Sequence, residues 1–169
     1  MKKTYHPISN IEEITPLFNK ISVFGSLKSK QLAEILKLLK TVKYDEGEFI
    51  YKRGENSSYI YIIKHGEVKM TIDNEGVFLE LISFKDGDCF GETSVIGIQT
   101  HSSSAYVVKP TELIVLEPSA LLNIFDTDKE IFGILILNIA RETARRLHQA
   151  NESLLQYMLL NKKNITKNN

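Results

Sequence analysis

Two stretches of the chain carry residue types suited to binding a small anion that is attached to a sugar. They are Phe90–Gly97 and Ser102–Val107. In the first, Gly91 follows a strand-like run and opens a short helical turn. Backbone N–H groups at a helix start can hold a phosphate, and the neighbouring Glu92 can accept hydrogen bonds from a sugar hydroxyl. No arginine follows these residues to pair with such an anion.

The elements that must position these stretches are short strands between Thr41 and Glu117. Six runs are rich in β-branched and aromatic residues, as strands are. Turn signals separate them at intervals of about 8 to 12 residues, which is typical of an all-β sandwich or barrel. The runs are Phe49–Tyr51, Tyr59–Ile63, Glu67–Ile72, Phe78–Ile82, Ser104–Val108 and Glu112–Leu116.

Helices are predicted on both sides of the strands. Leu32, Ile35, Leu36 and Leu39 recur at helical spacing, with Ser29 as the expected N-cap. After Pro118 we expect a short helix over 119–125 and a long one over 129–160. The chain therefore divides into a helical segment (1–40), a β-roll (41–118), C-terminal helices (119–160) and a polar, disordered tail (161–169).

Three motifs make the pattern more specific. Gly47–Glu55, Tyr61–Val68 and Asp86–Glu92 resemble the glycine framework of the cyclic nucleotide-binding domain family, to which the bacterial catabolite activator protein and the protein kinase A regulatory subunit belong. The resemblance covers roughly residues 17–160. It implies a mainly β fold, an eight-stranded jelly-roll β-barrel flanked by N-terminal helices and a long C-terminal helix.

The resemblance also implies a ligand, cAMP or cGMP, and a set of site residues. Residues 90–104 match the family's phosphate-binding cassette, in which Glu92 binds the ribose 2′-hydroxyl and backbone N–H groups after Gly91 meet the cyclic phosphate. No cofactor is required. The predicted site residues are Phe90, Gly91, Glu92, Thr93, Ser94, Ser102, Ser103, Ser104, Arg146 and Asn151.

The chain departs from the family at the arginine that pairs with the phosphate. Ser103 occupies that position, while counting from Gly91 without gaps gives His101 or Ser102. A histidine carries charge only below about pH 6.5, and it is a poor bidentate clamp. Losing a bidentate arginine from such a site costs about 2–5 kcal/mol. We therefore expect a degenerate cassette with weak affinity.

The long helix carries an apolar stripe that predicts a homodimer, and the alternative is that this stripe packs the helix on its own barrel. Its members step by four and three residues, as the a and d positions of a coiled coil do. Asn151 lies within the stripe, where a buried asparagine fixes register, and it also falls where family members contact the purine. The resemblance also implies that the Arg146 side chain reaches Glu92. The stripe, which we call the seam, comprises Ala140, Ala144, Leu147, Asn151, Leu154 and Met158.

Composition argues against several other classes. Twenty-one basic and 21 acidic residues balance, unlike a general polyanion binder. The single cysteine, Cys89, forms no internal disulfide and is expected to be a small buried hydrophobe. No apolar run reaches the 20 or so residues of a membrane span, so we expect a soluble, cytoplasmic protein.

Neither catalysis nor DNA binding is expected. The four histidines lack metal-ligand spacing, and no nucleophile elbow or Walker loop occurs, so no catalytic or metal-binding residue is assigned. Only about nine residues, nearly all polar, follow Leu160, so no DNA-binding domain is expected after the long helix. The prediction is a non-enzymatic cyclic nucleotide sensor that signals through its C-terminal helix. The alternative is a vestigial barrel that binds no nucleotide and acts as a dimeric module for a partner protein.

Overall fold

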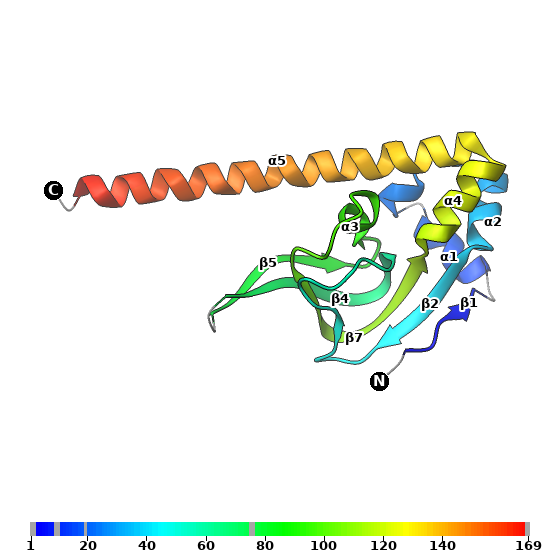
Figure 1. Ribbon diagram of the computed structural model, residues 1–169, viewed down its shortest axis with the longest axis horizontal. Helices are drawn as coiled ribbons and strands as arrows, with labels where there is room; N and C mark the ends of the chain where they lie inside the picture. The colour runs from blue at the N-terminus through cyan, green and yellow to red at the C-terminus, as the bar shows by residue number, and fades with distance from the viewer. Residues whose placement is uncertain (1–2, 9–10, 19, 75–76, 168–169) are drawn as a thin grey trace.

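The computed structural model describes residues 3–8, 11–18, 20–74 and 77–167. Within these ranges the strands form one antiparallel sheet, which curls beneath the long helix α5 (Figure 1). The elements, in chain order, are β1 (His6–Pro7), α1 (Ile11–Phe18), η1 (Ser22–Phe24), α2 (Ser29–Leu36), β2 (Leu39–Tyr44), β3 (Phe49–Tyr51), β4 (Ile60–Asn74), β5 (Val77–Lys85), β6 (Cys89–Phe90), α3 (Glu92–Ile96), β7 (Ser104–Leu116), α4 (Pro118–Thr127) and α5 (Lys129–Lys167).

The sheet confirms the predicted fold class but is built from fewer, longer strands. Its order is β1-β2-β7-β4-β5, with β3 paired to β7 and β6 paired to β4, seven strands in the described ranges. Seven strands are found where eight were expected, and two pairs of predicted runs are single strands, because β4 continues through Gly66 and β7 through Pro110. Register shifts between Ile63 and Val68 absorb the bend in β4, as β-bulges do.

The two central strands separate two apolar cores. Successive side chains of a strand point to opposite faces. Ile60 and Ile62 therefore face a core shared with the helices, whereas Tyr61 and Ile63 face the interior of the curled sheet. Burial on both faces explains why the run Tyr59–Ile63 is apolar throughout instead of alternating.

The helices follow the prediction with shifts at their ends. Lys28, and not Ser29, is the N-cap of α2, and its backbone N–H donates to the Gln31 Oε1 at 3.0 Å. Leu39 belongs to β2 instead of the predicted helix. Helix α5 continues to Lys167, past the predicted end at Leu160, and the last two residues of the predicted tail lie outside the described residues.

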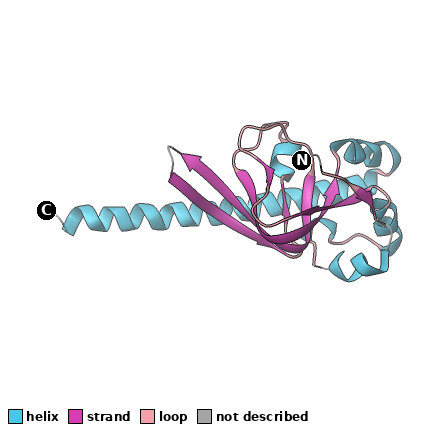
Figure 2. Cartoon of the chain, turned by 90° about the horizontal axis from the view of Figure 1, so that it is seen from below, coloured by secondary structure: helices cyan, strands magenta, loops and turns pink. Residues whose placement is uncertain are grey.

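The first half of helix α5 anchors it to the other helices. Ile131, Leu135 and Ile139 are buried in the core shared with the other helices. The Asn138 side chain donates to the carbonyl oxygens of Val23 at 3.1 Å and Gly25 at 2.7 Å. The second half of α5 and the β4–β5 hairpin extend beyond the rest of the molecule on the same side (Figure 2). Across the described ranges, no helix combines the length and apolar content that a membrane span requires.

Two glycines give a matched test of the bend in β4. Gly66 has φ +131°, and a Cβ there would lie 2.2 Å from the Thr111 Oγ1, whereas a Cβ on Gly133 in α5 would meet open space among the described residues. We expect Gly66→Ala to lower the free energy of unfolding by about 3 kcal/mol, since strain and overcrowding add. Gly133→Ala is expected to raise it by about 0.5–1 kcal/mol. Urea unfolding measures the stability of both variants. Equal effects would contradict the conclusion that Gly66, and not Gly133, stands at a position that excludes a side chain.

Candidate ligand-binding site

The cassette begins at a backbone position that only glycine fits. Gly91 links β6 to α3 with φ +82°, and a Cβ there would lie 2.8 Å from the Tyr59 carbonyl oxygen and 3.0 Å from the Tyr61 ring. Positive φ is readily available to glycine alone. Gly91 therefore sets the turn that places Glu92 at the first position of α3, against the long helix.

A cavity of about 160 Å³ lies between the cassette, the interior of the sheet and α5. Its wall contains aromatic and thioether side chains as well as serine and threonine side chains. The residues lining it are Tyr51, Met70, Phe84, Phe90, Gly91, Glu92, Thr93, Ser94, His101, Ser102, Ser103, Thr143 and Arg146. It therefore combines apolar surface with hydrogen-bonding groups, as small-molecule sites do.

The cavity brings together eight of the ten residues predicted from the sequence. The two others lie elsewhere. Ser104 belongs to β7, and its Oγ accepts a hydrogen bond from the backbone N–H of Arg53 at 3.0 Å. Asn151 is exposed on the part of α5 that leaves the barrel. A contact between Asn151 and a ligand remains a prediction that depends on a second subunit.

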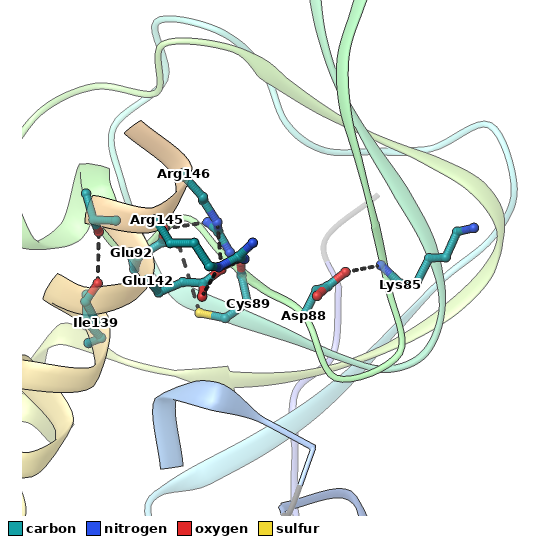
Figure 3. A network of polar contacts seen from close by, with 9 residues as sticks. Lys85, Asp88, Cys89, Glu92, Ile139, Glu142, Arg145 and Arg146 are labelled. Carbon is teal, nitrogen blue, oxygen red and sulfur yellow. Dashed lines mark hydrogen bonds and ion pairs between the residues drawn. The ribbon is translucent and has the colours of Figure 1, made fainter. Parts of the chain in front are cut away.

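Arg146 ties α5 to the base of the cassette. Its Nη1 donates to the Glu92 Oε1 at 2.6 Å, its Nε donates to the Glu142 Oε1 at 2.9 Å, and its Nη2 donates to the Cys89 carbonyl oxygen. The guanidinium carbon also lies 4.8 Å from the centre of the Phe84 ring. Figure 3 shows Arg146 and Glu142 of α5 converging with Cys89 of β6 and Glu92 of α3. The predicted contact between Arg146 and Glu92 is confirmed.

Burial and the two arginines set the protonation of this cluster. Burial raises the pKa of Glu92, whose side chain is 1% exposed, and the Arg146 charge opposes that rise. Burial also acts to raise the pKa of Glu142, but hydrogen bonds and charge from Arg145 and Arg146 outweigh it and lower this pKa. Burial raises the pKa of the Cys89 thiol well above its usual value. Cys89 is thus a neutral buried side chain, as expected from the sequence.

His101 belongs to the cavity wall but was not among the predicted site residues. It is 2% exposed, and its ring stacks on Tyr51 at 3.5 Å between centroids and 8° between planes. Its backbone is held by Gly54, whose N–H donates to it at 2.8 Å, and by Glu55, whose carbonyl accepts at 2.9 Å. Burial lowers the pKa of His101, and Glu55 partly opposes this. The sequence did offer one signal for His101, because counting from Gly91 without gaps places it or Ser102 where the family has its phosphate-binding arginine.

The cavity has little positive charge to offer an anion. Among the described residues that line it, Arg146 is the only permanent cation. All three of its guanidinium nitrogens donate to protein oxygens, two of which belong to Glu92 and Glu142. The Arg146 charge is therefore largely engaged by two carboxylates, and hydroxyl groups and backbone N–H groups are the further donors that the wall offers to a ligand phosphate.

Adjacent arginines of α5 test the cluster. The Arg146 side chain is 18% exposed, and Arg145, which pairs with Glu142 alone, is 54% exposed. We expect Arg146→Ala to lower the free energy of unfolding by about 3 kcal/mol, because it leaves Glu92 buried and unpaired. Arg145→Ala should cost about 1 kcal/mol or less. Chemical denaturation measures both, and similar losses would argue against a special role for Arg146.

Comparison with protein families gives a match over most of the sheet. The model described as "Cyclic nucleotide-binding domain" matches residues 41–128. A cGMP-dependent protein kinase of Caenorhabditis briggsae is 26% identical over 127 residues, which is 72% of this chain and 17% of the kinase. The human cyclic nucleotide-gated channel beta-3 is 35% identical over 80 residues, which is 47% of this chain and 10% of the channel. The chain thus spans less than a fifth of these two relatives.

Solved structures agree with the fold. A cyclic nucleotide-binding domain from Methylobacillus flagellatus superimposes with a TM-score of 0.76 at 21% identity, covering 85% of this chain and 82% of that one. The Thermus thermophilus catabolite activator protein gives a TM-score of 0.70 at 25% identity, covering 79% of this chain and 61% of that one. With its sheet, cassette and long helix so arranged, the chain belongs to the cyclic nucleotide-binding domain family.

Proposed function

We propose that this chain is a non-enzymatic regulatory module that binds cAMP or cGMP in the cavity between the cassette and α5. The observation that carries the proposal is the cluster of Arg146, Glu92 and the cassette backbone at one wall of that cavity. Family membership supports the ligand class. The relatives named as a cGMP-dependent kinase and a cyclic nucleotide-gated channel are consistent with it.

In the proposed complex, Glu92 and the hydroxyl side chains bind different parts of the ligand. Arg146 binds the Glu92 Oε1, and the Glu92 Oε2 lies 4.0 Å from the Cys89 Sγ. In the proposed complex this Oε2 accepts a hydrogen bond from a ribose hydroxyl. Ser94, Ser102 and Ser103 line the same cavity and donate to the cyclic phosphate, together with N–H groups of the cassette.

The missing arginine sets the expected affinity. A bidentate arginine in such a site is worth about 2–5 kcal/mol, and each 1.4 kcal/mol is tenfold in affinity. A site that would otherwise bind in the micromolar range is then expected to bind near millimolar. The proposed sensor therefore responds to high local nucleotide concentrations.

The seam on α5 supports a homodimer as part of the proposal. Its leucine and methionine members are exposed in the single chain: Leu147 is 62%, Leu154 56% and Met158 60% exposed. This contradicts packing of the stripe on its own barrel. A groove of about 450 Å³ between α3 and α5 continues the surface, with Ile96 and Ala144 in its wall. A second copy of α5 is the proposed occupant.

The first test of this function is nucleotide binding with an arginine restored. We expect cAMP or cGMP near 1 mM to raise the melting temperature, since a ligand that binds the folded state stabilises it. Ser103→Arg should tighten binding by roughly thirty- to several-thousand-fold by calorimetry. Ser119→Arg, on the exposed surface of α4, is the control for added charge. A dimer that binds neither nucleotide, even with Ser103→Arg, would instead support the protein-interaction module.

The second test separates the seam from the rest of α5. Leu154→Asp places a charge in the seam, and we expect monomers in sedimentation equilibrium at concentrations where the wild type is dimeric. Leu160→Asp places the same charge on a leucine that is also exposed, at 62%, on the opposite side of the helix. It should remain dimeric. Dimers of Leu154→Asp, or monomers of both variants, would show that the seam is not the interface.

A further inference from the structure

His101 is buried beside the cavity, and one of its ring nitrogens has no hydrogen-bond partner among the described residues, as expected of a group that binds a ligand. Its side chain is 2% exposed, and the Nε2 atom is buried with no hydrogen-bond partner among the described residues. Buried polar atoms are nearly always paired, and an exception calls for an explanation. Stacking on Tyr51 and backbone hydrogen bonds to Gly54 and Glu55 hold the residue in place.

The ring shares the cavity with the serines proposed to meet the phosphate. His101, Ser102 and Ser103 follow one another in its wall. Arg146 also lines the cavity, but each of its nitrogens already donates to a protein oxygen. Of the described residues in the wall, His101 is thus the only one that can acquire a new positive charge.

We propose that His101 takes the place of the family's arginine, so that an anionic ligand binds together with a proton that the imidazole takes up. The inference rests on the proposed function, because it concerns the phosphate of the same ligand. A rotation of the His101 side chain that turns a ring nitrogen toward the ligand, with the backbone still held by Gly54 and Glu55, is part of the proposal. The site then responds to two inputs, the cyclic nucleotide and pH.

The groups around the His101 ring determine whether it is neutral or protonated before the ligand binds. Burial favours the neutral imidazole, and the Glu55 charge favours the protonated one. Tyr51, which stacks on the ring, has a pKa raised by burial and stays neutral over the range of interest. Across the cavity, Glu92 and Arg146 form an ion pair. The free protein therefore holds His101 neutral near pH 7, and an anion in contact with the ring raises its pKa.

Linkage then gives the pH dependence. Between the His101 pKa of the free protein and that of the complex, binding consumes a proton, and the affinity rises as the pH falls. For uptake of one proton, the affinity can change by at most tenfold per pH unit. Below the lower of the two pKa values the affinity levels off. Binding of the proton and of the nucleotide are reciprocal, so the nucleotide also strengthens protonation.

The test is calorimetric titration of the full chain with cAMP at pH 7.5, 6.5 and 5.5, in two buffers of different ionisation enthalpy. The cAMP phosphodiester remains an anion throughout. We expect the wild-type Kd to fall by roughly tenfold from pH 7.5 to 5.5, with uptake of a fraction of a proton at pH 6.5. His101→Gln cannot take up the proton and should bind with a flat pH profile. His101→Arg should bind more tightly, also without pH dependence.

Controls separate this inference from the proposed function. His6→Ala removes an exposed histidine of β1 and should leave the wild-type profile unchanged, and melting curves check that each variant folds. A wild-type Kd that does not vary with pH overturns the role of His101 and leaves nucleotide binding in place. A pH dependence that survives in His101→Gln also overturns it and points to Glu92. Absence of wild-type binding at every pH overturns both proposals.

Discussion

The arrangement of the site depends on Arg146, whose guanidinium holds α5 against the cassette. Its three nitrogens donate to Glu92, Glu142 and the Cys89 carbonyl, which belong to α3, α5 and β6. Glu92 is almost fully buried, and a buried carboxylate is costly without a partner. The contact between α5 and the cassette, and the ionised state of Glu92, therefore depend on the same guanidinium group.

This contact lies between two hollows of the surface. Glu92, Thr93 and Thr143 line both the proposed ligand cavity and the apolar groove between α3 and α5. A ligand that moves the cassette would change the groove, and a second subunit in the groove would change the cavity. Shared walls of this kind give a physical route for coupling ligand binding to assembly, with equal effect in both directions.

The sequence predicted the parts of the fold that depend on local patterns. The strand runs, the helix beginning at Lys129 and the pairing of Glu92 with Arg146 follow from side-chain types, periodicity and the family resemblance. Strand continuity through Gly66 was missed because a glycine–glutamate pair after a strand signals a turn, whereas here pairing with β7 extends the strand. The place of His101 was missed because stacking on Tyr51 and burial depend on contacts about fifty residues apart.

A double-mutant cycle on Glu92 and Arg146 tests most directly whether this contact holds α5 to the cassette. The free energy of unfolding is measured for the wild type, Glu92→Gln, Arg146→Ala and the double variant. If the contact holds α5 to the cassette, the two losses are far from additive, with a coupling energy of about 2 kcal/mol or more. Additive losses within about 0.5 kcal/mol would show that the two side chains act independently and that their contact does not hold α5 to the cassette.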